Sequence, residues 1–350
     1  MKLAPLYRAL TEIGLETKIV NTGQHYDKML SSIFFQELVL PKPHFSLKVP
    51  PSSPLSQISN MLSEFEKICD SIRPEMVVVV GDVNSTLACS LASAKLGIPL
   101  SHVESGLRSF DREMPEEINR IIVDHLSDYC FTTTKIASEN LTNEGIDQSR
   151  IHFVGNVMID CLVMHEEKIR KSSICEKLNI VEGEFDVLTL HRPSNVNSHT
   201  KLDQILSQFD TANSRDQLVF PVHPRTMKTL QDNALLDNSK FSRIKFIEPL
   251  GYIDFIQLIS KSAFVWTDSG GIQEETTYLG IPCFTVRDNT ERPETLELGT
   301  NKLISFDQIK SISESLPRKN INVRKIGNIP LWDGKASYRI AEIISQILSL

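Results

Sequence analysis

The sequence lacks the features that mark secreted, membrane-spanning or nucleic-acid-binding proteins. Its six cysteines are scattered and none forms a Cys-x-x-Cys pair, which indicates reduced thiols in a cytoplasmic protein and no disulfide framework or zinc site. No apolar run approaches the roughly 18 residues that a membrane helix needs, and the first residues do not resemble a secretory signal. The net charge is -7 and no long basic run is present, which argues against a nucleic-acid partner.

Metal-binding motifs are missing as well. The chain contains no His-x-x-x-His or Asp-x-Asp cluster, so we expect no metal site. Carboxylates together with a histidine remain an alternative set of metal ligands, although their spacing does not favour it.

The chain has the composition of a two-domain α/β protein, and its predicted strands and helices alternate as in that class. Its 350 residues suggest about two domains, and a hydrophobic content of 41% is enough for ample cores. Patterns typical of strands alternate with patterns typical of helices, which predicts parallel sheets. The predicted strands include Met76–Val80, Pro99–Val103, Tyr129–Thr133, Ile151–Val154, Phe185–Leu190, Leu218–Val222, Ile244–Ile247, Ala263–Trp266 and Pro282–Val286.

About ten strands are too many for one small domain, so we predict two doubly wound domains that meet at a cleft. The first domain is predicted to comprise residues 1–155 together with the C-terminal helix 336–350. The second is predicted to comprise residues 156–335.

One stretch, residues 266–294, is typical of half a nucleotide site. A strand ends at Thr267-Asp268-Ser269, two glycines follow, and a helix then begins. The first N–H groups of a helix and its dipole favour an anion, and glycines allow a phosphate to approach the backbone. The alternative is an ordinary Gly-Gly turn in a βαβ unit, because short glycine motifs are weak signals.

Polar residues follow the predicted strands, at the edge where ligands bind in open α/β sheets. The first half offers carboxylates, which would repel one another in a cleft, so one of them should have a raised pKa that suits a general acid or base. The second half is basic and rich in glycine. These residues are Asp82, His102, Glu104 and Glu116 in the first half, and His191-Arg192, His223, Arg225, Ser269-Gly270-Gly271 and the loop 287–294 in the second.

Simpler interpretations exist for several of these residues. Asp82 could be a helix N-cap, and Glu116 could complement the first turn of its helix. His102 could be a core histidine, and His191 could be a local cap. A carboxylate at the end of a buried strand has few structural roles, so among these residues Glu104 is the hardest to explain without a function.

The motifs together resemble one family over nearly the whole chain, the non-hydrolysing UDP-N-acetylglucosamine 2-epimerases. No single motif is specific, but the combination is. The matching stretches are Gly81-Asp82 with Ser85-Thr86, residues 102–108, Pro115-Glu116-Glu117-Ile118-Asn119-Arg120, His191-Arg192, residues 222–226, 267–275 and 290–294, and Gly299-Thr300.

This resemblance implies a GT-B-type fold, in which two Rossmann-like domains hold the active site between them, and a homodimer. It implies reversible conversion of UDP-N-acetylglucosamine to UDP-N-acetylmannosamine, without a nicotinamide cofactor or metal. The family's route eliminates UDP to give a 2-acetamidoglucal and then adds UDP back after C2 is reprotonated from the other face.

The resemblance also implies roles for individual residues. Asp82, Glu104 and Glu116 match catalytic carboxylates, and His191 matches a residue near the sugar and phosphate; which carboxylate takes the C2 proton is left open. The residues implied in binding UDP are Lys2, Ser269, Gly270, Gly271 and Arg292 on the phosphate side, Glu275 at the ribose and Phe255 near the uracil.

Three departures from the family pattern are visible. The family begins with a strand and a Gly-Thr-Arg-Pro-Glu loop, whereas this sequence begins just after them, so we expect the first strand and its arginine to be absent. Leu250 stands where a glutamine is often found near the uracil. Gln24 matches an activating second substrate site, but Asp27, Met61 and Pro193 do not, so allosteric activation is not expected.

Alternative functions differ in what happens to the intermediate. A hydrolysing epimerase would release free N-acetylmannosamine, and a GT-B-type glycosyltransferase would share the diphosphate clamp without needing three carboxylates. A non-catalytic UDP-sugar-binding remnant is a third alternative. A modified sugar such as a diacetamido-uronate is an alternative substrate.

Overall fold

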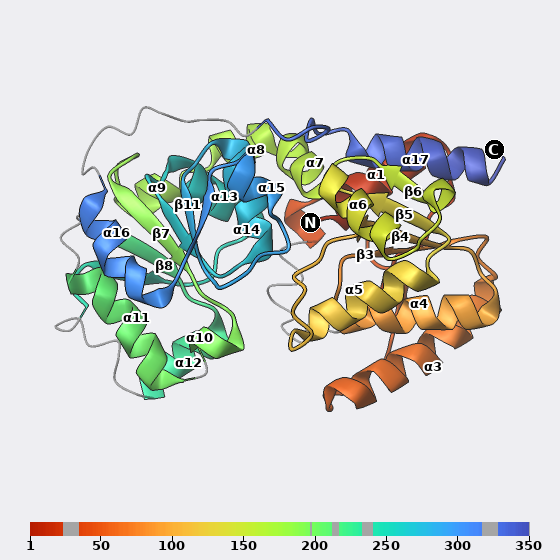
Figure 1. The fold of residues 1–350 in the computed structure, drawn as a ribbon, viewed down its shortest axis with the longest axis horizontal. Helices are drawn as coiled ribbons and strands as arrows, with labels where there is room; N and C mark the ends of the chain where they lie inside the picture. The colour runs from red at the N-terminus through yellow and green to blue at the C-terminus, as the bar shows by residue number, and fades with distance from the viewer. Residues whose placement is uncertain (24–34, 197, 212–216, 233–240, 317–327, 350) are drawn as a thin grey trace. The chain divides into compact units, whose positions relative to one another are not determined.

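The computed structural model describes residues 1–23, 35–196, 198–211, 217–232, 241–316 and 328–349. They form two compact units (Figure 1). The first unit contains Met1–Met164 and Ile329–Leu350, and the second contains His165–Asn328.

The first unit is built on a parallel sheet of four strands in the order β3-β4-β5-β6. Parallel strands need crossover connections, which explains the alternation of strand and helix patterns in the sequence. Two short strands, β1 and β2, pair separately. The strands are β1 (Val20–Asn21), β2 (Phe45–Ser46), β3 (Val77–Val80), β4 (Leu100–Ser105), β5 (Tyr129–Thr132) and β6 (Ile151–Phe153).

Helices cover both faces of this sheet. Figure 1 shows α1 beside α17, and their apolar residues, such as Leu6 and Ile340, pack on Phe131 of the sheet. On the other face α3 and α4 run side by side and enclose Met61, Phe65 and Leu100. The helices are α1 (Leu3–Glu12), α3 (Pro54–Ile72), α4 (Asn84–Leu96), α5 (Pro115–Leu126), α6 (Lys135–Asn143), α7 (Val157–Met164) and α17 (Ala336–Ile347).

The first unit extends past the boundary expected at residue 155. Gly155 has a φ of 92°, and a Cβ atom there would collide with the carbonyl oxygen of Leu331, in the returning segment of the same unit. Beyond it, α7 packs on α1 and α17, and Asp160 accepts a 3.1 Å hydrogen bond from the N–H of Ala336 at the start of α17. The glycine is therefore a packing point inside the unit, and the division falls after Met164.

The second unit contains a parallel sheet of six strands in the order β12-β11-β10-β7-β8-β9. This is the doubly wound order. Successive strands are added in one direction from β7 to β9 and in the other direction from β10 to β12, so the order reverses between β7 and β10. The strands are β7 (Phe185–Thr189), β8 (Gln217–Pro221), β9 (Ile244–Ile247), β10 (Val265–Thr267), β11 (Cys283–Val286) and β12 (Asn301–Ile304).

Helices also flank this sheet on both sides. One apolar cluster joins α11 and α16 to the sheet and contains the fully buried Trp266, which stacks on Phe284. A second cluster joins α13 and α14 to the opposite face. The helices are α8 (Glu166–Lys171), α9 (Ile174–Lys177), α10 (Pro193–Val196), α11 (His199–Thr211), α12 (Pro224–Asp232), α13 (Tyr252–Lys261), α14 (Gly270–Leu279), α15 (Glu294–Glu297) and α16 (Ile309–Ser315).

Both sheets are parallel and covered by helices, in agreement with the predicted α/β class. Among the described residues, no helix combines the length and the apolar character needed to cross a membrane.

Candidate active site

Glu104 ends a buried strand in a backbone conformation that is unusual for its residue type. It lies in β4, is 4% exposed and has a φ of 75°. The pairing of β4 with β5 shifts register between Val103 and Ser105, so Glu104 occupies an irregularity of the β-bulge kind. Positive φ is costly for any residue other than glycine, and bulges and strained residues occur often beside active sites.

The Glu104 carboxylate faces Lys2 and Gly81. Lys2 Nζ forms an ion pair with Glu104 Oε2. Gly81 follows β3 with a φ of 76°, and a Cβ atom there would lie 3.4 Å from Lys2 Nζ and 3.5 Å from Glu104 Oε2. Lys2, which the resemblance places in the UDP-binding set, is therefore held next to a predicted catalytic carboxylate.

Asp82 follows Gly81 and is an ion-pair partner of α5. The interpretation of Asp82 as a helix N-cap is wrong, because α4 begins at Asn84 and its N-cap is Val83, without a side-chain cap. Asp82 Oδ2 instead lies 2.6 Å from Arg120 Nη1, and the Asp82 carbonyl accepts a 2.8 Å hydrogen bond from Asn119.

Arg120 has no role predicted from the sequence beyond its place in a matching motif. It is fully buried, and its Nη2 lies 2.7 Å from Glu117 Oε2. Burial tends to raise the pKa of Glu117, but the N–H of Ser109 and the Arg120 guanidinium outweigh burial and lower it. The i,i+3 spacing of Glu117 and Arg120 could have indicated this pair.

Glu116 lies in the first turn of α5 and is exposed. It makes no hydrogen bond or ion pair with the described residues. Residues four apart share one side of a helix, so Glu116 lies on the same side of α5 as Arg120. Among the described residues, Arg120 pairs with Asp82 and Lys2 pairs with Glu104, whereas Glu116 has no such partner.

In the second unit, the reversal of strand order brings His191 and Asp268 together. His191 follows β7 and Asp268 follows β10, and these strands are neighbours. His191 Nδ1 lies 2.8 Å from Asp268 Oδ1. The imidazole is 56% exposed, so Asp268 orients it while its other ring nitrogen stays accessible. No role for Asp268 is predicted from the sequence, although the doubly wound order predicts that these two strand ends adjoin.

Asp268 is fully buried and accepts several hydrogen bonds. The backbone N–H groups of His191 and Arg192 and the amide of Asn195 all donate to its carboxylate, at 2.9 to 3.3 Å. Burial tends to raise the pKa of Asp268, but His191, Asn195 and Arg192 outweigh burial and lower it. Asp268 is therefore an ionised anchor for the loop after β7.

The N-terminus of α14 carries the predicted phosphate site. Ser269 is its N-cap, but the Ser269 side chain makes no capping hydrogen bond. The first N–H groups of a helix, here those of Gly270 and Gly271, have no partner within the helix itself. A Cβ atom on Gly270 would lie 2.6 Å from Arg292 Nη1, so glycine allows this guanidinium to lie against the helix start.

Carboxylates hold Arg292 in this place. Arg292 Nε lies 2.7 Å from Glu274 Oε1, and Arg292 Nη1 lies 3.6 Å from Glu291 Oε2. Glu291 is also paired with Arg287 through two contacts of 2.9 Å. All four side chains are buried, so the guanidinium of Arg292 is fixed before any anion arrives.

Glu294 is a titratable group of this cluster with no role predicted from the sequence. It is 3% exposed, and neither carboxylate oxygen has a hydrogen-bond partner among the residues described. Burial and the nearby negative charge of Glu274 raise the pKa of Glu294 to about 7, although Arg292 opposes them.

The residues implied at the nucleoside end lie on two helices that contact each other, α13 and α14. Glu275 is buried in α14, one residue after Glu274. Phe255 lies in α13 and packs, partly buried, against the apolar cluster that also contains Leu250.

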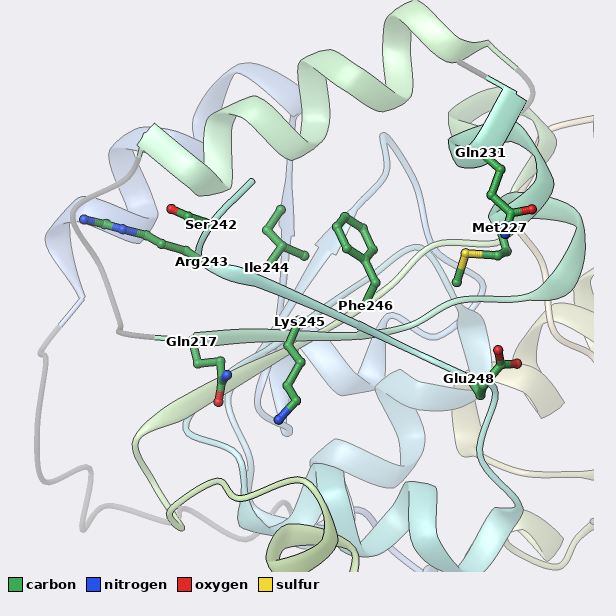
Figure 2. A pocket seen from close by; sticks show the side chains of 9 residues that line it. All are labelled: Gln217, Met227, Gln231, Ser242, Arg243, Ile244, Lys245, Phe246 and Glu248. Atoms are coloured by element: carbon green, nitrogen blue, oxygen red, sulfur yellow. The ribbon is translucent and has the colours of Figure 1, made fainter. Parts of the chain in front are cut away.

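A cavity of about 560 Å³ opens elsewhere in the second unit, beside β9 and α12 (Figure 2). Phe246 and Ile244 point to one side of β9, while Lys245 points to the other (Figure 2). No predicted site residue lines it. The cavity therefore follows the free edge of the sheet and is separate from the strand ends that carry the candidate site.

Across the described ranges, no group of three or more His, Cys, Asp or Glu side chains could hold a metal ion. Gln24 and Asp27, which bear on the predicted lack of allosteric activation, lie outside the described residues. Met61, which bears on the same prediction, lies in α3 and is fully buried in the core that α3 and α4 share with the sheet.

Comparison with known proteins adds independent findings. Residues 8–345 match the family model for UDP-N-acetylglucosamine 2-epimerase. A UDP-N-acetylglucosamine 2-epimerase from Methanocaldococcus jannaschii is 40% identical over 353 residues, covering 99% of this chain and 95% of that protein. A UDP-2,3-diacetamido-2,3-dideoxy-D-glucuronate 2-epimerase from Pseudomonas aeruginosa is 36% identical over 332 residues, covering 94% and 91%. The crystal structure of the Methanocaldococcus jannaschii UDP-GlcNAc 2-epimerase with UDP-GlcNAc and UDP matches with a TM-score of 0.86 and 39% identity, covering 99% of this chain and 96% of that one.

Proposed function

Because this chain belongs to the UDP-N-acetylglucosamine 2-epimerase family, we propose that it inverts C2 of UDP-N-acetylglucosamine, reversibly, to give UDP-N-acetylmannosamine. Family membership makes the protein an isomerase, and it confirms the resemblance and the GT-B-type fold predicted from the sequence.

The proposed route is elimination followed by addition. A carboxylate takes the C2 proton while the C1–O bond to UDP breaks, which gives a 2-acetamidoglucal and UDP. The C2 proton is not adjacent to a carbonyl group, so departure of UDP must provide the driving force. A proton then returns to C2 from the opposite face, and the UDP oxygen adds to C1.

The observation that carries this proposal is the strained Glu104 carboxylate beside Lys2. A buried carboxylate held by one cation is suited to exchange a proton with a carbon atom, because its position is fixed before the substrate binds. Asp82 is fixed in a comparable way by Arg120. Two positioned carboxylates fit a reaction that removes a proton from one face and returns it to the other.

The second unit supports the assignment of UDP. The N-terminus of α14 and the Arg292 guanidinium provide positive charge in fixed positions, which would stabilise the diphosphate as it leaves. His191, oriented by Asp268, offers its second ring nitrogen for the leaving oxygen or the sugar.

Incubation with UDP-N-acetylglucosamine in deuterated water tests the function. The expected product is UDP-N-acetylmannosamine with deuterium at C2, followed by NMR and mass spectrometry. Free N-acetylmannosamine and UDP would identify a hydrolysing epimerase instead. UDP binding without turnover would identify a binding protein, and transfer of the sugar to an added acceptor would identify a glycosyltransferase.

Glu104→Gln tests the catalytic assignment. We expect turnover to fall by at least roughly 10²–10⁴-fold, with the Kd for UDP changed little, because the groups assigned to UDP lie mainly in the second unit. Glu113→Gln is the matched control, since Glu113 is exposed just before α5. Loss of UDP binding in Glu104→Gln would contradict a catalytic role.

The Pseudomonas aeruginosa relative makes a diacetamido-uronate the second candidate substrate. The ratio of kcat/KM for the two UDP-sugars decides between them, and we expect UDP-N-acetylglucosamine to be preferred. A higher kcat/KM for the uronate would indicate that this protein, like that relative, acts on the diacetamido-uronate. The homodimer and the cytoplasmic location are part of the same proposal, and light scattering after gel filtration tests the dimer.

A further inference from the structure

His102 lies between two oxygen atoms inside the first unit. It is fully buried in β4, in register with Val79 of β3 and Cys130 of β5. Its Nδ1 lies 2.6 Å from Asp124 Oδ1, and its Nε2 lies 2.9 Å from the carbonyl oxygen of Gly81. Both ring nitrogens thus have the polar partners that a buried imidazole requires, and the identity of those partners is informative.

Both partners accept hydrogen bonds. A backbone carbonyl has no proton to donate, and an ionised carboxylate accepts only. Asp124 is held in its ionised form, because its Oδ2 lies 2.7 Å from Arg108 Nη1 and also accepts the N–H of Gly106. Both ring nitrogens of His102 therefore face hydrogen-bond acceptors.

A doubly protonated His102 would extend a chain of ion pairs inside the first unit. Arg108 makes a bidentate contact of 2.6 Å with Glu144 as well as its contact with Asp124. The chain His102–Asp124–Arg108–Glu144 is then two cations and two anions.

Through Gly81, the hydrogen bonds of His102 extend to the candidate site. The carbonyl of Gly81 is bonded to His102, its N–H donates to Val103, and its Cα faces Lys2 and Glu104. Asp82 is the next residue. The orientation of the turn that presents Asp82, and the surface against which Glu104 lies, thus depend on the hydrogen bond from His102 Nε2.

We propose that His102 is a positioning residue of the epimerase site, a doubly protonated imidazolium that clamps the Gly81–Asp82 turn and adds a buried positive charge behind the catalytic carboxylates. This inference rests on the proposed function. The charged and titratable groups around this position are Asp124 on α5, Arg108, Glu144 and Arg150 from the following segments, Cys130 on β5, Glu104 on β4, and Lys2, Asp82 and Arg120 at the site.

NMR of protein labelled with ¹⁵N-histidine tests the protonation state directly. We expect both ring nitrogens of His102, assigned by comparison with a His102 variant, to show bound protons at pH 8. A ring nitrogen without a proton at this pH overturns the proposal. This measurement does not depend on turnover, so it separates a failure of this inference from a failure of the proposed function.

Two variants separate the two hydrogen bonds. In His102→Gln the amide nitrogen replaces Nε2 and keeps the bond to Gly81, whereas in His102→Asn it replaces Nδ1 and keeps the bond to Asp124. We expect kcat to fall about 10-fold in His102→Gln and at least about 100-fold in His102→Asn, with KM for UDP-N-acetylglucosamine within about threefold of wild type. Equal kcat values in both variants would overturn the clamp.

The pH dependence of kcat separates a positioning charge from a purely structural role. Loss of the imidazolium disfavours ionised carboxylates nearby, so the pH below which kcat falls should rise by roughly half a unit to one unit in His102→Gln. Circular dichroism and thermal melting establish that each variant is folded. If His102→Asn does not fold, His102→Gln alone decides: wild-type kcat with an unchanged pH profile overturns the proposal.

Discussion

His191 Nδ1 lies 2.8 Å from Asp268 Oδ1, although the two residues are 77 positions apart in the sequence. The buried carboxylate fixes the ring orientation and favours a proton on Nδ1, so that Nε2 is available to the substrate. This pairing follows from the neighbouring positions of β7 and β10 in the sheet.

Asp268→Asn should therefore impair turnover more than nucleotide binding. An amide at this position can present its nitrogen to His191 and remove the preference for a proton on Nδ1. We expect kcat to fall by roughly 10²–10⁴-fold. Isothermal titration should show a Kd for UDP within about fivefold of wild type. Asp307→Asn, at an exposed aspartate of the same unit, is the control, and wild-type turnover in Asp268→Asn would refute the assignment.

The stability of the second unit should depend on the ionisation of Glu294. Its pKa rises from 4.5 to about 7 on folding, so the folded state binds the proton more tightly. The resulting contribution to stability is present below about pH 4.5 and is lost as the pH rises through about 7, by on the order of 3 kcal/mol.

Glu294→Gln removes this dependence. The variant should be more stable than wild type at pH 8 and should lose that advantage at pH 5, in urea unfolding followed at both pH values. Glu314→Gln, at an exposed glutamate of α16 in the same unit, should show almost no such difference. Parallel pH curves for wild type and Glu294→Gln would show that Glu294 is not the titrating group.

Gly270→Ala should weaken UDP binding without unfolding the protein. The new Cβ atom would lie 2.6 Å from Arg292 Nη1, so the end of the arginine side chain must shift and strain its ion pairs with Glu274 and Glu291. Displacement of the guanidinium from the start of α14 should raise the Kd for UDP by about 10-fold, or roughly 1.4 kcal/mol. The melting temperature should stay within a few degrees of wild type. An unchanged Kd would place the diphosphate away from this guanidinium.

Gly106→Ala and Gly97→Ala form a matched pair for the first unit. Both glycines have positive φ, at 79° and 68°, but a Cβ atom at Gly106 would collide with the backbone carbonyl of Ala137, whereas at Gly97 it would meet nothing within 4 Å. We expect Gly97→Ala to cost about 1–2 kcal/mol and Gly106→Ala about 3 kcal/mol or more in unfolding free energy. Equal losses would show that backbone conformation alone sets both costs.

The architecture was predictable because buried parallel strands have a simple signature. The run Val77–Val80 forms β3, since strands covered on both faces are continuously apolar, whereas β9 (Ile244–Ile247) is an edge strand in which Lys245 interrupts the apolar residues. The residues that follow these strands could also be predicted, because parallel strands end at one edge of a sheet.

The contacts of the site were less predictable. Arg120 with Asp82 and His191 with Asp268 join elements far apart in the chain, and periodicity does not indicate which side chains meet. Helix starts also mislead: Asp82 has the chemistry of an N-cap, but α4 begins two residues later. The positive φ of Glu104 and the raised pKa of Glu294 depend on backbone pairing and burial, which only the folded chain defines.

The first unit is made from two stretches of chain that the entire second unit separates. Its core includes Ile340 and Ile344 of α17, and Asp160 accepts a hydrogen bond from the backbone N–H of Ala336. A growing chain on the ribosome therefore cannot complete the first core until α17 has been made, whereas the second unit has all of its residues earlier. We expect the second unit to mature first, and fragments cut at Met164 to expose an unfinished surface on α1.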